Sequence, residues 1–204
     1  MADSVNRVSA AVGRALDDRQ REATEEVERI LSAAVRVSER MAPDSPRVSD
    51  IVAEANSSNK AFYRYFAGKD DLMMAVMERG VAQVVSYLQH QMDKAADPAD
   101  KISRWLEGSL APVADPHLTS MSRATVAQMS VSANRQIIDS EIMAPMRDLL
   151  TEPFAALGRS AADADTVFLC ATATMRRYFG AGREPGPDDI AHLVNFCLKG
   201  IGAR

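Results

Sequence analysis

The sequence of 204 residues contains few of the residues on which several other protein classes depend. Its two cysteines, Cys170 and Cys197, lie far apart and form no Cys-x-x-Cys pair, so a disulfide framework is not expected. The three histidines are scattered, and no two have the spacing of metal ligands. Buried cysteines that behave as small apolar residues are the simplest interpretation. We therefore expect no metal and no cofactor.

Long apolar runs are also missing. No run reaches the roughly 18 residues that a membrane-spanning helix needs. The first residues, 1–6, lack the basic and apolar segments of a secretory signal. These absences predict a cytoplasmic protein with no membrane partner. The net charge of −4 argues against a broad basic surface, but it allows a basic patch on one small face.

Sustained alternation of β-branched residues, the pattern of a β-strand, is absent as well. What is present is helical periodicity that proline and glycine interrupt. Over residues 18–42 apolar side chains recur every three or four positions, which predicts a long amphipathic helix. We interpret residues 1–17 as a flexible arm that precedes it. The predicted fold class is all-α.

A pair of short helices is predicted after this long helix. Ser45 can cap the first of them, with Pro46 in the first helical position, and the helix ends near Ala55. A tight turn over residues 56–58 leads to the second short helix, over residues 59–65. Two short helices joined by a three-residue turn and supported by a preceding helix form a helix-turn-helix.

The remainder of the chain is predicted to form a larger helical bundle that begins near Lys69. Pro145 lies inside a helical pattern there and is expected to kink that helix. The last two predicted helices, over residues 163–179 and 187–201, are strongly apolar. These two helices are therefore the expected surface for forming a dimer.

The segment 47–69 is locally basic within an acidic chain. Lysine and arginine pair with phosphate or guanine, asparagine offers a base both a donor and an acceptor, and tyrosine hydroxyls bind phosphate oxygens. A solvated helix face of the same composition is the plain alternative. The candidate DNA-binding residues are Arg47, Ser58, Asn59, Lys60, Tyr63, Arg64, Tyr65 and Lys69.

Three stretches of this region resemble the DNA-binding domain of TetR-type transcriptional regulators. They are residues 30–37, residues 48–55 and, most specifically, FYRYFAGKDDL over residues 62–72. The resemblance covers roughly residues 25–78. It implies phosphate contacts for Tyr63 and Lys69, and possible ones for Tyr65, while residues 58–60 form the exposed start of the recognition helix.

Some residues depart from the family pattern. Asn56 stands where the family usually has glycine, and asparagine tolerates the left-handed conformation that the turn demands. Ser57 replaces a small apolar residue, so the turn is expected to lose a packing contact. Lys60 and Ala61 stand where the family favours glycine and a hydroxyl residue, so operator preference is expected to differ. Ser38 replaces an aromatic residue on the first helix.

The C-terminal bundle is rich in methionine, of which the chain has eleven. Methionine adapts to irregular cavities, and the family resemblance implies a ligand pocket between these helices. Ordinary core filling is the alternative interpretation for each single residue. The candidate ligand-binding residues are Trp105, Met121, Gln128 and Met129.

The sequence therefore predicts two modules. Residues 1–68 form an N-terminal arm and a three-helix, helix-turn-helix DNA-binding domain, and residues 69–204 form a larger ligand-binding and dimerisation domain. The resemblance implies a homodimeric repressor that binds a palindromic double-stranded DNA operator and is released by a small apolar effector. One alternative is that the C-terminal domain docks a protein partner instead. The other is a helical-bundle enzyme, for which the sequence offers no acid–base pair or metal motif, so we predict no enzyme.

Overall fold

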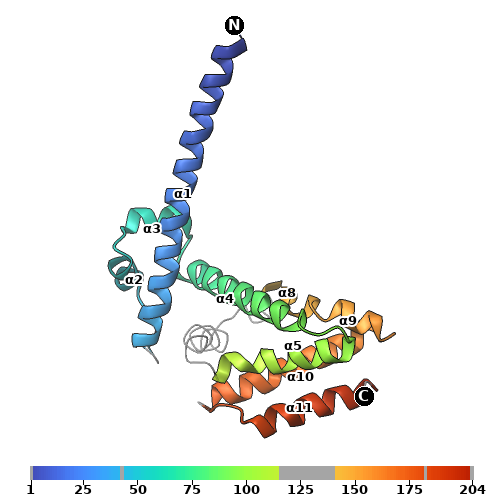
Figure 1. The fold of residues 1–204 in the computed structure, drawn as a ribbon. Coiled ribbons are helices and arrows are strands. Elements are labelled where there is room, and N and C mark those ends of the chain that lie inside the picture. Colours follow the sequence, from blue (N-terminus) through green and yellow to red (C-terminus); the bar gives the residue numbers. More distant parts are fainter. Residues whose placement is uncertain (1, 42–43, 115–140, 182, 203–204) are drawn as a thin grey trace. The chain divides into compact units, whose positions relative to one another are not determined.

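The computed structural model describes residues 2–41, 44–114, 141–181 and 183–202, and these residues form helices and their connections (Figure 1). The chain divides into two compact units, Met1–Met73 and Met74–Arg204. The division falls inside the helix that begins at Lys69, whereas the sequence analysis placed the domain boundary at the start of that helix.

The N-terminal unit consists of α1 (Ala2–Met41), α2 (Val48–Glu54), α3 (Asn59–Tyr65) and the start of α4 (Lys69–Met92). α1 contacts α2, and α2 contacts α3. The bounds of α3 agree with the prediction. Completely buried apolar residues come from all four helices: Ile30, Ala33, Ala34, Val37, Ile51, Phe62 and Leu72. Burial of these side chains is the main driving force for folding this unit.

α1 begins much earlier than expected. Residues 2–17, which we interpreted as a flexible arm, continue the helix (Figure 1). Alanine, leucine and arginine are strong helix formers, and this segment contains no proline, so propensity extends the helix beyond its packed part. Val8, Val12 and Leu16 are exposed on it. Further along α1, Ser38 is buried, and its hydroxyl has no hydrogen-bond partner among the described residues.

The start of α2 also differs from the expectation. Arg47 occupies the N-cap position, but its side chain makes no capping hydrogen bond. Pro46, just before it, is buried. The Ser45 hydroxyl, the expected cap, instead accepts a hydrogen bond of 2.8 Å from Lys69 Nζ. A tertiary contact therefore replaces the local capping interaction that the sequence suggested.

The C-terminal unit contains most of α4 together with α5 (Pro98–Ala114), α8 (Ala144–Asp148), α9 (Thr151–Ala156), α10 (Ala161–Gly180) and α11 (Pro187–Gly200). α5 packs against α9, α10 and α11, and it runs alongside α10 and α11 in Figure 1. α5 also approaches α4 closely, because a Cβ atom at Gly108 would lie 2.7 Å from Leu88 Cδ2. The two apolar C-terminal helices agree with the predicted ones to within two residues.

Helix starts in this unit follow simple capping rules. The Asp97 carboxylate accepts a hydrogen bond of 2.8 Å from the Ala99 amide at the start of α5. Pro145 occupies one of the first two positions of α8, where a proline costs no helical hydrogen bond. Residues 141–143 just before α8 depart from α-helical geometry, so within the described residues this proline stands at the start of an α-helix and not in its interior. Among the described residues, no helix is both long and apolar enough to cross a membrane.

Candidate nucleic-acid interface

The turn between α2 and α3 has the geometry of a helix-turn-helix. Asn56 has a φ of +50°, the left-handed conformation expected from its position in the turn. The Ser57 amide donates a hydrogen bond of 3.0 Å to the Val52 carbonyl, which closes the end of α2. Ser58 is the N-cap of α3, and its hydroxyl accepts a hydrogen bond of 3.1 Å from the Ala61 amide. The turn therefore fixes where α3 begins.

α3 divides cleanly into a buried and an exposed side. Phe62 is completely buried, and the Tyr63 ring meets it edge to face with centroids 5.1 Å apart. The rest of the Tyr63 side chain reaches solvent, since the residue is 62% exposed. The exposed residues of α3 include four of the sequence-predicted candidates: Asn59, Lys60, Tyr63 and Arg64.

Glu26 of α1 connects α1 to both the turn and α3, and it was not among the residues predicted from the sequence. Its carboxylate accepts hydrogen bonds from the Tyr65 hydroxyl at 2.9 Å and from the Ser57 hydroxyl at 3.2 Å. Arg64 lies 3.9 Å from the same carboxylate and forms an ion pair with it. Glu26 lies one helical turn before the buried Ile30, and an acidic residue at the edge of the apolar stripe was the available signal.

The contacts with Glu26 give Ser57 and Tyr65 roles that differ from the predicted ones. The Ser57 hydroxyl, expected to cost the turn a packing contact, forms a polar link to α1. The Tyr65 hydroxyl is directed inward to Glu26, so in this structure Tyr65 positions α3, and a phosphate contact by the same hydroxyl would have to share it with Glu26. Neither role follows from the turn sequence alone, because both depend on a residue more than thirty positions earlier.

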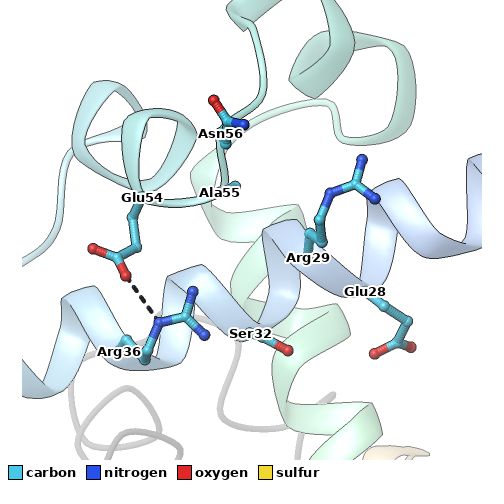
Figure 2. Close-up of a pocket in the computed structure, with 7 residues that line it drawn as sticks. All are labelled: Glu28, Arg29, Ser32, Arg36, Glu54, Ala55 and Asn56. Atoms are coloured by element: carbon cyan, nitrogen blue, oxygen red, sulfur yellow. Dashed lines mark hydrogen bonds and ion pairs between the residues drawn. The ribbon is translucent and has the colours of Figure 1, made fainter.

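A second carboxylate links α1 to α2. Glu54 accepts a hydrogen bond of 2.9 Å from Arg36 Nε (Figure 2) and another of 3.1 Å from Arg40. The Arg36 hydrogen bond, with that of Arg40 next, holds the pKa of the Glu54 carboxyl below its usual value. A hollow of about 420 Å³ opens beside this ion pair, and Figure 2 shows its lining of mostly charged and polar residues: Glu28, Arg29, Ser32, Arg36, Glu54, Ala55 and Asn56.

The remaining DNA-binding candidates flank the motif. Arg47 is exposed at the start of α2. Lys69, at the start of α4, is half-buried and donates its hydrogen bond to Ser45. The backbone amide of Ala67 donates to the Asp71 carboxylate at 2.8 Å, which orders the approach to α4. All eight candidates therefore lie within the N-terminal unit: six at the N-cap of α3 or on α3 itself, Lys69 at the start of α4, and Arg47 at the N-cap of α2.

Of the four ligand-binding candidates, the structure describes Trp105 alone. Trp105 is completely buried, its indole N–H donates a hydrogen bond of 3.1 Å to the Met146 carbonyl, and its ring lies 6.2 Å from that of Phe168. The structure thus gives Trp105 a role in the core of the C-terminal unit. Met121, Gln128 and Met129 lie outside the described residues. Within the part of the chain that the structure describes, no group of three His, Cys, Asp or Glu residues could hold a metal ion.

The chain is similar to known proteins at two levels. Residues 30–76 match the family model TetR_N, described as bacterial regulatory proteins of the tetR family. This match spans the packed part of α1, the helix-turn-helix and the beginning of α4. No curated protein matches the chain.

Solved structures extend the likeness over most of the chain. The fatty acid degradation regulator FadR from Bacillus halodurans is 18% identical, with a TM-score of 0.63 over 87% of this chain and 99% of that one. FadR from Bacillus subtilis, in complex with stearoyl-CoA, is also 18% identical, with a TM-score of 0.62 over 85% and 96%. A TetR family regulator from Marinobacter aquaeolei VT8 is 16% identical, with a TM-score of 0.57 over 89% and 97%. At these identities the likeness establishes the fold.

Proposed function

We propose that this protein, which belongs to the TetR family of bacterial transcriptional regulators, is a cytoplasmic homodimeric repressor that an apolar ligand releases from its operator. As a regulator of this family it binds DNA and is not an enzyme. In the proposal residues 1–68 contact the operator, and residues 69–204 bind the ligand and form the dimer. The observation that carries the DNA-binding part is the exposed side of α3, held in place by the capped turn before it.

The exposed side of α3 offers two kinds of contact. Asn59 and Lys60 lie in its first turn, where side chains of a recognition helix reach base edges in the major groove. Tyr63 and Arg64 follow, and together with Arg47 and Lys69 they suit phosphate oxygens. Base contacts select the operator sequence, whereas phosphate contacts fix the position of the protein on any sequence.

The dimer would form through α10 and α11. Leu169 on α10 is 59% exposed and Phe196 on α11 is 63% exposed, which is unusual for side chains of this size. Burying them against a second copy removes apolar surface from water. A twofold dimer would place two α3 helices in successive major grooves about 34–36 Å apart, and it therefore requires a palindromic operator.

The proposed effector is a molecule with a long apolar chain. FadR from Bacillus subtilis, a protein of similar fold, was solved in complex with stearoyl-CoA. The C-terminal unit of this chain is built around a large apolar cluster. Moving an acyl chain from water into such an apolar interior lowers the free energy of the system. Binding would shift the population towards a conformation that no longer fits the operator.

DNA binding is tested by fluorescence anisotropy on a palindromic operator selected from a random library. Tyr63→Phe removes one phosphate-directed hydroxyl, so affinity for all sequences should fall alike, by about 3–10-fold. Lys60→Ala should instead change the preference between operators that differ by one base. Lys94→Ala, an exposed cation of the C-terminal unit, is the matched control and should change neither. If Lys60→Ala leaves both affinity and preference unchanged, the assignment of α3 is wrong.

The effector is tested separately with stearoyl-CoA and, as the matched control, free coenzyme A. Stearoyl-CoA should raise the melting temperature by mass action, and coenzyme A should not. The chain has a single tryptophan, so the fluorescence of Trp105 reports changes in the C-terminal core. If neither stearoyl-CoA nor stearate changes the melting temperature, the proposal of an acyl effector is wrong, while the DNA-binding part of the proposal is unaffected.

A further inference from the structure

The first part of α1 is a helix that lies outside the packed core of its unit. This N-terminal extension, residues 2–25, continues beyond α2 and α3 (Figure 1) and precedes the residues that match the family model. No residue from 7 to 25 is buried. A Cβ atom at Gly13 would meet no atom from elsewhere in the described chain within 4 Å. The N-terminal extension therefore adds nothing to the core of the N-terminal unit.

The N-terminal extension carries an apolar stripe. Val8, Val12 and Leu16 recur every four residues and so lie on one side of the helix. They are 65%, 53% and 58% exposed. Arg14 and Arg21 lie on the opposite side. An amphipathic helix in a protein owes most of its stability to the packing of its apolar side. The exposed stripe therefore indicates a partner outside the single chain.

The charge and the shape of this helix favour a second copy of itself as that partner. Residues 2–25 contain four arginines and five acidic residues, so they do not suit a polyanion such as DNA or an acidic membrane surface. Small residues border the stripe, Ala11 and Ala15 on one edge and Ser9 and Gly13 on the other. The distance between two packed helices depends on the side chains at the contact, so small residues here allow a close approach.

We propose that the N-terminal extensions of two copies of this chain pair as antiparallel helices centred on Val12. In this register Val12 lies beside Val12 of the other copy. Val8 lies beside Leu16, because each is four positions from the centre. The antiparallel order thus sets the smaller side chain against the larger one, and it places the dipoles of the two helices in opposite directions.

This pairing is a second self-contact besides the proposed dimer contact through α10 and α11. Those two helices belong to the C-terminal unit, so the two contacts use different units. Three apolar side chains per copy cover far less than the roughly 1,200 Å² of a stable interface, so the pairing is weak by itself. It would join dimers to one another where their local concentration is high. The inference does not depend on the proposed operator or effector.

Disulfide trapping tests the contact in the full chain, in a Cys170→Ala background that removes the partly exposed native thiol. After oxidation with copper phenanthroline, Val12→Cys should link two chains at least about tenfold faster than Arg14→Cys on the opposite side of the helix. The ratio should persist when Leu169→Glu and Phe196→Glu remove the proposed dimer contact. A Val12→Cys chain that links no faster than Arg14→Cys would overturn the proposal, whatever the state of the α10–α11 dimer.

Mixed chains test the orientation. Val8→Cys mixed with a size-tagged Leu16→Cys should give a linked pair of unequal chains on a non-reducing gel. Neither should link to itself, because in an antiparallel pair the two copies of each residue are about 12 Å apart along the axis. Self-linked Val8→Cys would show a parallel pair and contradict the register. Absent linking in Val12→Cys, with a lower operator affinity in Val12→Gln, would assign the stripe to DNA and would equally overturn the proposal.

Discussion

Each unit of this protein has an apolar core, but the two units differ in the contacts that supplement it. In the N-terminal unit, polar side chains join helix to helix: Glu26 reaches the turn and α3, and Glu54 is held by Arg36 and Arg40. The C-terminal unit relies mainly on a large apolar cluster. Directional bonds fix an orientation, whereas apolar packing tolerates many combinations of side chains of similar volume. This difference agrees with a family signature confined to residues 30–76 and a likeness elsewhere at the level of the fold.

The largest effect is expected from Phe62→Ala, which tests whether the two units lose stability independently. Phe62 is completely buried, so its truncation should cost about 3–5 kcal/mol and abolish operator binding. Hydrogen exchange should show lost protection across residues 30–66 and retained protection in α5 and α10. Tyr63→Ala, on the exposed side of the same helix, should cost far less stability. Equal loss of protection in both units would break the comparison.

The next effect concerns the apolar surface of the C-terminal unit. Replacing Leu169 and Phe196 together by glutamate should give a folded monomer in sedimentation, because both side chains are exposed in the single chain. Operator affinity should then fall by about 100-fold or more, since the second α3 no longer binds the same DNA molecule. Ala82→Glu, at an exposed position on α4, is the control. A double variant that remains dimeric would place the interface elsewhere.

Glu26→Gln tests the polar network of the N-terminal unit. The variant loses the charge that pairs with Arg64 and weakens the bonds from Tyr65 and Ser57, so we expect a loss of about 1–2 kcal/mol in stability. Operator affinity should fall by about tenfold because α3 is less well oriented. Glu25→Gln, an exposed neighbour, controls for the lost charge. If both variants behave alike, the network around Glu26 does not position α3.

A smaller effect is expected from the backbone of the turn. Asn56→Ala places a less tolerant residue at a φ of +50° and should cost about 1–2 kcal/mol. Asn56→Gly should be close to neutral, since glycine adopts this conformation without strain. Chemical denaturation of the wild type and the two variants gives their order of stability. A ranking with alanine as stable as glycine would contradict the left-handed geometry.

The smallest effect is the pH dependence of the contact between α1 and α2. The arginines lower the pKa of Glu54 in the folded state, so its stabilisation is fully present above the unfolded value of 4.5 and is lost as the pH falls through the folded value. The melting temperature, measured by circular dichroism between about pH 6 and pH 3, should therefore fall more steeply with decreasing pH in the wild type than in Glu54→Gln. Parallel curves would show that this ion pair contributes nothing measurable.

The sequence was most informative where local rules decide the structure. α3 and the left-handed Asn56 followed from turn chemistry, and α10 and α11 followed from the glycine and proline breaks around them and from their apolar composition. It was least informative where distant residues meet. Ser45 bonds Lys69 in place of capping α2, and Glu26 of α1 bonds Ser57 of the turn and Tyr65 of α3. Single-sequence patterns carry no information about such pairings, because they depend on the packed fold.

The unbroken α1 also constrains how the DNA-binding motif can move. Glu26 holds α3 and the turn, while Arg36 and Arg40 hold α2, and these residues belong to one helix. Glu26 and Arg40 are about 20 Å apart along the axis, so α1 anchors both short helices to a single stiff rod. We therefore expect α2 and α3 to move together with α1. A signal that reaches this motif is then expected to change the spacing or tilt of the whole motif, because turning α3 alone would break its bonds to Glu26.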